Sequence, residues 1–363
     1  MRTSWFFIAC LSLLALGCQD DGPARSRDDA GPGDKDAAVD APDASDAQGD
    51  AAESAAEPET TRSLGSSGTH ACALRKAGLY CWGENFLGQL GDGTTTDSET
   101  PVKASVAGTD IVDVAVATGR TCVRRSTGQV ACWGANDAGQ IGDGTRKDAL
   151  AAVEVPGITD AVHLTVAVQS TCAVRKDGSV ACWGNLPEGA SGGSLTPTSV
   201  AGLSQVVELV TAGATGYCAR SRDGSVRCFR FENDAWSEPA EVAEFKGAIS
   251  IAMSNTQMAC AAMRDVGILC RDLERGAMAT LTNSLGYAKL SGLNLVVCGI
   301  EAAGKGRCWN VVPEIVLDIP ASVPLAEVSI TGLAVCTLGE DRSVMCASGN
   351  AVVPIPMAVT LPD

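Results

Sequence analysis

Between residues 61 and 363, short runs of alternating apolar and polar residues come in pairs, with a few turn-forming residues between the two runs of each pair. The clearest copies read TCVRRSTGQVACWG from Thr121 and TCAVRKDGSVACWG from Thr171; weaker copies read YCARSRDGSVRC from Tyr217 and VCTLGEDRSVMC from Val335. Alternation with a period of two is typical of a strand with one buried face, and two such runs around a turn predict a β-hairpin. The chain therefore repeats a hairpin.

Glycine marks the turn of most of these hairpins. In the copy from Thr171 the loop is Lys176-Asp177-Gly178, whose third position suits glycine because glycine adopts a left-handed conformation without a Cβ penalty. The equivalent glycines are Gly78, Gly128, Gly178, Gly224 and Gly304. Gly267 comes one residue late in the fifth copy and Arg342 replaces glycine in the last copy, so we expect those two turns to differ.

Further apolar runs flank each hairpin and raise the number of strands per repeat to four. Runs rich in small residues precede the hairpins, such as IVDVAVA from Ile111 and AVHLTVAV from Ala161, and short runs such as VKASVA from Val102 follow them. Seven such units without helical periodicity predict an all-β fold, a seven-bladed β-propeller with four short antiparallel strands per blade.

Fourteen of the sixteen cysteines form seven evenly spaced pairs, one per hairpin. The pairs are Cys72 with Cys81, Cys122 with Cys132, Cys172 with Cys182, Cys218 with Cys228, Cys260 with Cys270, Cys298 with Cys308, and Cys336 with Cys346. Directly opposed residues on antiparallel strands have Cα atoms about 4.5–5.5 Å apart, so each pair can close a disulfide worth roughly 2–3 kcal/mol. Reduced core thiols are the alternative. We expect no metal site, because zinc needs four clustered ligands and the chain has two histidines.

The segments CWGENFLGQLGDGT from Cys81 and CWGANDAGQIGDGT from Cys132 carry a longer signature. They resemble repeats of the regulator of chromosome condensation family, whose blades show a W-G-x-N-x-x-G-Q-L-G-x-G pattern. The pattern persists in part as CWGNLPEGASGGS from Cys182 and then erodes to CFRFEN, CRDLER, CWNVVP and CASGNA. The resemblance implies a seven-bladed propeller, in agreement with the independent count of hairpins.

The family also has functional precedents. Its eukaryotic namesake is an exchange factor for a Ran-type GTPase and binds chromatin, and a secreted bacterial relative inhibits β-lactamases with one face of its propeller. The resemblance therefore implies a binding role, and the export signal described next argues against the nuclear one.

Residues 1–17 read as a signal peptide, with a basic start and an apolar run that is too short to span a bilayer. Leu14-Ala15-Leu16-Gly17-Cys18 resembles a bacterial lipobox, which predicts a lipidated Cys18, and Gln19 resembles an outer-membrane sorting signal. An ordinary signal cleavage nearby is the alternative. We expect an exported protein of the bacterial cell envelope, attached to the outer membrane or cell surface through lipid only.

Residues 18–60 read as a disordered acidic tether and residues 61–363 as the propeller. The tether is rich in Asp and Ala and lacks aromatic residues, so it cannot bury enough apolar surface to fold. It carries thirteen acidic and three basic residues, which is most of the formal net charge of −16. The propeller is only mildly acidic, which argues against nucleic acid as a partner.

The sequence contains no catalytic constellation, so we predict no enzymatic activity and no cofactor. His70 and His163 lie in or beside predicted strands, where a structural role is favoured, and no phosphate-binding loop is present. Scattered carboxylates leave a glycosidase-like pair open without positive support. The Gly-Asp-Gly segments lack the spaced oxygen ligands of an EF-hand.

We therefore predict a monomeric, non-enzymatic binding module, receptor-like or inhibitor-like, for an envelope or extracellular protein. The alternative is a structural or adhesive surface lipoprotein that contacts polysaccharide or neighbouring cells. Loops held by a rigid scaffold are where binding residues collect. The candidate binding residues are Phe229, Arg230, Phe231 and Trp236 in the unusual fourth repeat, with Asn85, Phe86 and Arg146 as weaker candidates. Alternatively, the fourth-repeat aromatics replace the missing Trp-Gly and fill a blade boundary, as we expect of Trp82, Trp133, Trp183 and Trp309.

Overall fold

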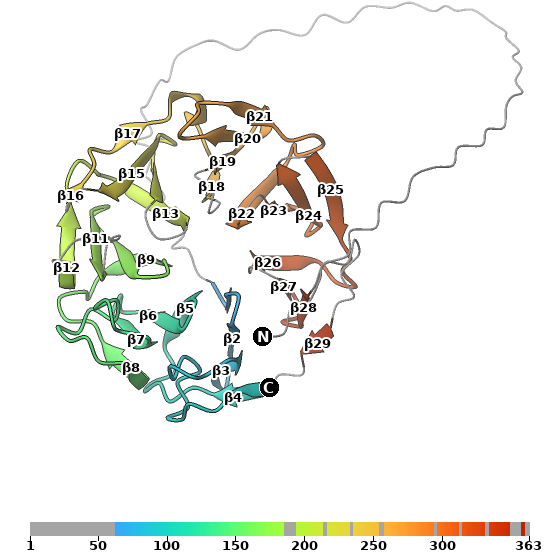
Figure 1. Ribbon diagram of the computed structural model, residues 1–363. Helices are drawn as coiled ribbons and strands as arrows, with labels where there is room; N and C mark the ends of the chain where they lie inside the picture. Colours follow the sequence, from blue (N-terminus) through green and yellow to red (C-terminus); the bar gives the residue numbers. More distant parts are fainter. Residues whose placement is uncertain are drawn as a thin grey trace, which may run out of the picture. The chain divides into compact units, whose positions relative to one another are not determined.

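The computed structural model describes residues 62–184, 194–212, 216–232, 235–253, 258–293, 296–311, 314–330, 334–348 and 357–359. These residues form seven antiparallel sheets around a common centre, the seven-bladed propeller that the sequence predicts (Figure 1). Six blades have four strands in simple sequence order from the centre outward. In blade 4 two short strands share the outer position, because both pair with the third strand.

Blade 1 consists of β1 (Leu64–Ser66), β2 (His70–Arg75), β3 (Gly78–Gly83) and β4 (Ser98–Lys103), and blade 2 of β5 (Ile111–Ala117), β6 (Arg120–Arg125), β7 (Val130–Gly134) and β8 (Ala149–Glu154). Blade 3 consists of β9 (Ala161–Val166), β10 (Ser170–Arg175), β11 (Val180–Gly184) and β12 (Ser194–Val200). Blade 4 consists of β13 (Val206–Ala212), β14 (Gly216–Ser221), β15 (Val226–Glu232), β16 (Ala235–Trp236) and β17 (Ala240–Glu241). Blade 5 consists of β18 (Ser250–Met253), β19 (Met258–Met263), β20 (Gly267–Asp272) and β21 (Met278–Thr280). Blade 6 consists of β22 (Tyr287–Leu293), β23 (Val296–Glu301), β24 (Gly306–Val311) and β25 (Glu314–Ile319). Blade 7 consists of β26 (Leu325–Ile330), β27 (Ala334–Gly339), β28 (Val344–Ser348) and β29 (Met357–Val359). A short 3-10 helix, η1 (Ala243–Phe245), links blades 4 and 5.

Each predicted cysteine pair is a disulfide across the two middle strands of its blade. The bonds join Cys72 with Cys81, Cys122 with Cys132, Cys172 with Cys182, Cys218 with Cys228, Cys260 with Cys270, Cys298 with Cys308, and Cys336 with Cys346. The paired cysteines are directly opposed in the strand register. Their Cα atoms lie 4.0–4.1 Å apart in all seven pairs, closer than the expected distance of about 4.5–5.5 Å. The disulfides therefore cross-link strands that are already neighbours.

The prediction for the last hairpin turn is wrong. Arg342 adopts the left-handed conformation with φ 67°, and its N–H donates to the Gly339 carbonyl as the Gly178 N–H does to Arg175. The backbone hydrogen bond and the strands on either side hold this turn in its usual shape although arginine is strained there.

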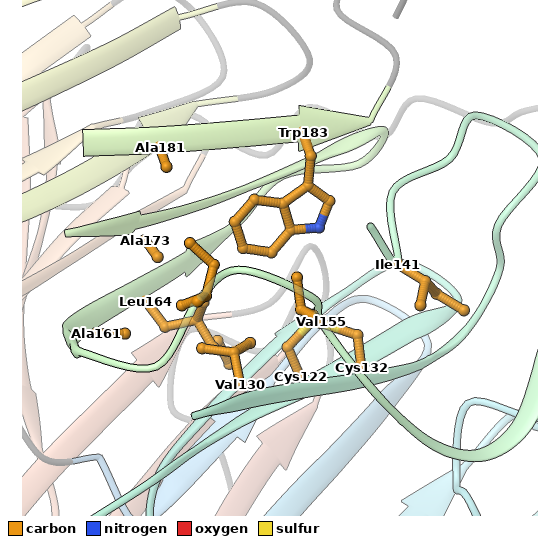
Figure 2. Close-up of a cluster of buried hydrophobic side chains, with 12 residues drawn as sticks. Cys122, Val130, Cys132, Ile141, Val155, Ala161, Leu164, Ala173, Ala181 and Trp183 are labelled. Atoms are coloured by element: carbon orange, nitrogen blue, oxygen red, sulfur yellow. A yellow bond between two sulfur atoms is a disulfide. The ribbon is translucent and has the colours of Figure 1, made fainter. Parts of the chain in front are cut away.

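The hydrophobic core lies between neighbouring blades. Trp183 of blade 3 is fully buried among side chains that include Ile141 and Val155 of blade 2 (Figure 2). Trp133 and Trp309 occupy equivalent boundaries. The prediction that the tryptophans after the second cysteine belong to the inter-blade core is confirmed for these three, and the half-buried Trp82 packs at the boundary of blades 7 and 1.

The ring closes between β1 and β26, so blade 1 comes wholly from the N-terminal side of the propeller and blade 7 from the C-terminal side. Glu327 of blade 7 accepts hydrogen bonds from the backbone N–H groups of Ser63 and Leu64. Ser66 donates to Ser329 at 2.7 Å. The closure therefore consists of side-chain bridges and apolar packing, and among the described strands no sheet mixes the two ends.

Glu208 makes the same kind of bridge further round the ring. It accepts hydrogen bonds from Ser250 Oγ at 3.2 Å and from the Ile251 N–H at 3.3 Å, which joins blade 4 to blade 5. On its own blade it pairs with Arg220 at 2.8 Å. Acidic side chains on the innermost strands thus link successive blades.

Among the described residues, no helix has the length and apolar character needed to cross a membrane. The predicted signal peptide, lipidated Cys18 and tether lie outside the described residues.

Candidate functional site

The antiparallel order of the strands gives the propeller two different faces. The turn between the first and second strands of a blade and the loop between its third and fourth strands lie on one face, because neighbouring strands run in opposite directions. We call this the loop face; its long segments in blades 1 and 2 are residues 84–97 and 135–148. The hairpin turns, such as 176–178, lie on the opposite face, which we call the turn face.

Asn85 organises the loop of blade 1 from inside. Its side chain is completely buried. Its Oδ1 accepts a hydrogen bond from the Leu90 N–H at 2.9 Å, and its Nδ2 donates to the Thr94 carbonyl at 3.1 Å and to Asp92 at 3.2 Å. Asn136 makes the equivalent bonds in blade 2. The prediction of Asn85 as a surface residue is therefore wrong, because the loop folds around its amide.

The aspartate of the Gly-Asp-Gly segment completes this loop. Asp92 accepts hydrogen bonds from the backbone N–H and the hydroxyl of Thr94 at 2.9 and 2.8 Å. Although partial burial acts to raise it, these bonds and the one from Asn85 lower the pKa of Asp92. Turn chemistry accounts for the segment, and the described part of the chain holds no cluster of side chains suited to a metal ion.

The same loop approaches the next blade closely at a glycine, where there is no room for a side chain. A side chain on Gly91 would collide with the indole of Trp133 in blade 2, and one on Gly142 would collide with Trp183 in blade 3. Trp133 Nε1 also donates to the Gln89 carbonyl at 3.0 Å. The loop of blade 1 therefore packs on the tryptophan of blade 2, and the loop of blade 2 packs on the tryptophan of blade 3.

Phe86 distinguishes the loop of blade 1 from that of blade 2. Its side chain is 57% exposed and stands at the position of Asp137. In blade 2, Gln140 Nε2 donates to Asp137 Oδ1 at 2.9 Å. In blade 1 the corresponding Gln89 Nε2 is buried without a hydrogen-bond partner among the described residues. Blade 1 thus presents an exposed aromatic ring beside an unsatisfied amide.

Two further exposed apolar side chains lie on the loop face. Leu150 is 39% exposed and packs on Gly88 of the blade 1 loop, and Val168 is 45% exposed on the first turn of blade 3. Arg120 links this turn to blade 2 by donating to the Val168 carbonyl at 3.4 Å. Sequence reasoning missed both residues, because alternation alone assigns apolar residues to the buried side.

Arg146 lies on the same face. It is exposed, and its Nη1 donates to the Asp137 carbonyl at 2.8 Å, which holds the side chain against the blade 2 loop. The structure therefore places the weaker candidates Phe86 and Arg146 on one face, in neighbouring blades.

The fourth-repeat candidates do not form one surface cluster. Phe229 is only 4% exposed and stacks on Tyr217 with ring centroids 5.4 Å apart, at the boundary of blades 3 and 4. A side chain this buried cannot contact a partner, so Phe229 fills the boundary where other blades have tryptophan. Arg230 is half-buried. Phe231 and Trp236 pair across β15 and β16, and their side chains lie outside the described residues.

Both histidines are buried and have structural partners. His70 Nε2 bonds to Thr121 Oγ1 at 2.8 Å, and His163 Nε2 donates to the Leu209 carbonyl at 2.8 Å. Burial lowers the pKa of His70 to about 3. Burial, together with the positive charge of Arg62, lowers the pKa of His163 to about 4. Thr121 Oγ1 in turn donates to the Gln89 carbonyl at 2.8 Å, so the hydroxyl beside His70 takes part in a structural hydrogen bond.

The cysteines have a structural role as well. In the later blades, where the loop signature has eroded, Cys270 and Cys308 are buried and Cys346 is partly buried. Each is bonded to the cysteine opposite it on the neighbouring strand. Every cysteine among the described residues is bonded in this way, so none offers a thiolate as nucleophile or metal ligand.

The architecture defines an all-β, seven-bladed propeller. Residues 76–123 match the family model "Regulator of chromosome condensation (RCC1) repeat", so the propeller contains a repeat of this type. The matched segment begins at the hairpin turn of blade 1 and ends in β6 of blade 2, so the sequence repeat is offset from the structural blade.

Sequence relatives match only a short part of this chain. The human E3 ubiquitin-protein ligase HERC2 is 36% identical over 80 residues, which is 21% of this chain and 2% of the ligase. The chain thus spans a very small share of that relative's length.

Solved structures match most of the propeller, at sequence identities that establish the fold alone. Yeast RCC1 (Prp20), solved with Kap60, aligns with a TM-score of 0.63 at 14% identity, over 78% of this chain and 83% of that one. PorZ, described as a bacterial surface component of the type-IX secretion system of Porphyromonas gingivalis, aligns with a TM-score of 0.57 at 10% identity, over 84% of this chain and 38% of PorZ.

Proposed function

We propose that the protein is an exported, non-enzymatic protein-binding module, receptor-like or inhibitor-like, that is held at a bacterial envelope by a lipidated Cys18 and binds its partner through the loop face. The observation that carries this proposal is Phe86, an aromatic ring 57% exposed on a loop that buried Asn85 fixes from below. Exposed aromatic side chains on rigid loops are typical anchors of protein interfaces, because they bury a large area at a low entropic cost.

Other exposed side chains support the same face. Leu150 and Val168 add apolar surface to the loop face, and Arg146 adds a guanidinium on the loop of blade 2. Aromatic residues and arginine are enriched at interface hot spots.

The location rests on the chemistry of the chain. Seven disulfides favour an oxidising compartment outside the cytosol. The Leu14–Cys18 motif supports lipid attachment. PorZ offers a precedent for a propeller-containing bacterial surface protein.

The activities of the similar proteins are not carried over. The HERC2 match covers 2% of the ligase, and we propose no ligase activity from it. Yeast RCC1 was solved with the protein Kap60, which supports a protein as the class of partner and not that partner in particular.

The binding test compares the two faces in the full-length oxidised protein. A loop-face variant carries Phe86→Ser and Leu150→Ser, and a turn-face control carries Val266→Ser and Leu285→Ser, two residues that are 52% and 62% exposed. Wild type and both variants are immobilised and incubated with solubilised envelope and secreted fractions. We expect a protein retained near one-to-one by wild type and by the control, and lost from the loop-face variant.

Two outcomes would overturn the proposal. Retention of glycan alone would favour the adhesive alternative, and equal retention by both variants would remove the loop face as the binding surface. Binding of the identified protein to purified wild type, measured by calorimetry, separates a direct partner from a co-purifying one.

The anchor is tested separately. A clickable palmitate analogue fed to the expressing bacteria should label the wild-type protein and leave Cys18→Ser unlabelled and released from the membrane fraction. Labelling that persists in Cys18→Ser would contradict lipidation at this residue.

A further inference from the structure

A small cavity of about 200 Å³ lies at the boundary of blades 4 and 5. It is separate from the loops of blades 1 and 2 that carry the proposed interface. Its lining combines charged and apolar side chains. The residues that matter for its chemistry are Arg230, Glu238, Glu241, Val242, Arg271 and Leu273.

This boundary lacks two parts that fill the boundaries of blades 1 and 2 and of blades 2 and 3. At the boundary of blades 1 and 2, the glycine-rich loop closes over Trp133. Blade 4 has only short segments after β15, and in blade 5 Arg271 follows the second cysteine where blades 2 and 3 have tryptophan. A guanidinium and open space therefore replace an indole and its covering loop.

Some of the charged side chains that line the cavity form ion pairs, and others have no charged partner among the described residues. Arg271 forms an ion pair with Glu244 of η1, and Glu241 pairs with Arg227 at 3.8 Å. Arg230 is half-buried and has no ion pair among the described residues, although its backbone is fixed by Ser237, whose N–H donates to the Arg230 carbonyl at 2.7 Å.

Glu238 supplies the complementary charge. It is exposed at the rim of the cavity, next to Ser237, and no described residue pairs with it. Arg230 lies in β15 and Glu238 lies between β16 and β17, so one cation and one anion of blade 4 are left for a ligand. The apolar side chains of Val242 and Leu273 also line the cavity, with the rings of Tyr217 and Phe229.

We propose that the blade 4/5 cavity binds a small zwitterion of the α-amino acid class. The carboxylate of the ligand pairs with the Arg230 guanidinium, whose planar fork matches a carboxylate, and the ammonium group faces Glu238. The ligand side chain lies against Val242 and Leu273. The volume is below the roughly 300–1,000 Å³ of sites for drug-sized ligands, which fits a single amino acid. A simple anion would leave Glu238 unpaired.

The probes are L-alanine, glycine and L-valine, with acetate and methylammonium as the two halves of the zwitterion. Each is titrated into the full-length oxidised protein after exhaustive dialysis, with isothermal calorimetry and the thermal transition as readouts. We expect an amino acid to bind more tightly than either half-ligand by about tenfold or more, because a charge-assisted hydrogen bond contributes about 1.5–3 kcal/mol.

The variants test the assigned contacts. Arg230→Gln is expected to weaken L-alanine and acetate alike by about tenfold or more, whereas Glu238→Gln is expected to weaken L-alanine and spare acetate. Arg222→Gln is the matched control, because Arg222 is exposed on the same blade and does not line the cavity. Both test side chains are at least partly exposed, and an unchanged thermal transition without ligand confirms folding.

Three results would overturn the proposal. They are the absence of heat and of a thermal shift with every amino acid at about 10 mM, acetate binding as tight as L-alanine, and L-alanine binding unchanged in Arg230→Gln. Because Phe86 lies in a different blade, these results are independent of the loop-face experiment.

Discussion

The carboxylate of Glu327 accepts hydrogen bonds from the backbone N–H of Ser63 at 2.8 and 2.9 Å, one to each oxygen. These residues lie 264 positions apart in the sequence and belong to the last and first blades. Burial raises the pKa of Glu327, and the amide hydrogen bonds oppose that shift. The carboxylate therefore links the last blade to the first blade of the propeller.

Replacing this carboxylate should weaken the whole fold. Glu327→Ala leaves the Ser63 and Leu64 amides without their acceptor, and we expect a loss of about 2–3 kcal/mol in the free energy of unfolding. Glu274→Ala, which removes an exposed acid, is the control and should stay within about 0.5 kcal/mol of wild type. Urea denaturation followed by fluorescence measures both. Equal stability of the two variants would show that the closure depends on apolar packing alone.

Neighbouring residues of the blade 1 loop should separate stability from binding. Asn85→Ala removes a buried amide with several hydrogen bonds, so we expect a loss of about 2–3 kcal/mol. Phe86→Ala removes an exposed ring and should leave the unfolding free energy within about 0.5 kcal/mol of wild type while partner binding is lost. Thermal denaturation and the retention assay are read side by side. A Phe86→Ala protein as unstable as Asn85→Ala would contradict this division of roles.

Much of the fold could be predicted from the sequence because its determinants are local. The alternation around Cys172 and Cys182 fixes which residues face each other, and the observed register pairs them directly. Ring closure could not be predicted, since it depends on which late residue meets β1. Nothing in the sequence around Glu327 indicates that its partners are amides 264 residues away.

The site was predicted less well, for a physical reason. A loop pattern does not tell whether a side chain points inward or outward: Asn85 points inward to serve the backbone, and adjacent Phe86 points outward. Phe229 stands out by composition and yet is buried, because its position after a second cysteine is the inter-blade position of tryptophan. The sequence named Phe86 only as a weaker candidate; comparison of the two loops residue by residue would have given it more weight, because it occupies the place of Asp137.

That comparison gives a prediction about the blade 1 loop. Phe86→Asp restores the acceptor that Gln140 has in blade 2, so the Gln89 amide gains a partner, and we expect a stabilisation of about 0.5–1.5 kcal/mol. Thr95→Asp adds the same charge to the loop at an exposed position and should be neutral within about 0.5 kcal/mol.

The stabilisation by Phe86→Asp should depend on the side-chain amide of Gln89. Combining Phe86→Asp with Gln89→Leu should abolish the stabilisation in a double-mutant cycle monitored by thermal unfolding. If the single and double variants gain equally, the effect belongs to surface charge and not to the Gln89 amide.

Acidification should destabilise the propeller well above the pH at which surface carboxylates titrate. The folded-state pKa values of His70, about 3, and His163, about 4, lie below the unfolded value of 6.5, so the unfolded state binds more protons between these limits. The stability that the neutral rings contribute is present above about pH 6.5 and is lost as the pH falls, by about 2 kcal/mol per histidine at about pH 5. The raised pKa of Glu208 acts in the opposite direction, because its protonation favours the folded state.

The pH effect is measured as the unfolding free energy between about pH 7 and about pH 5. His163→Gln keeps a donor for the Leu209 carbonyl and cannot titrate, so its curve should be flatter than that of wild type. A wild-type curve that is flat over this range, or a His163→Gln curve as steep as wild type, would contradict the prediction.

The contact between Gly91 and Trp133 means that a change in one repeat also affects the packing of the neighbouring repeat. The loop of one repeat packs on the tryptophan of the following repeat. The loop and this tryptophan therefore form one structural unit across the blade boundary, and replacing either one disturbs the other. The same boundary in blades 4 and 5 has lost both, with Arg271 in place of the indole. Anyone who transplants a blade into another propeller should therefore cut at the hairpin turns, where the matched segment 76–123 begins, and carry each loop together with its neighbour's tryptophan.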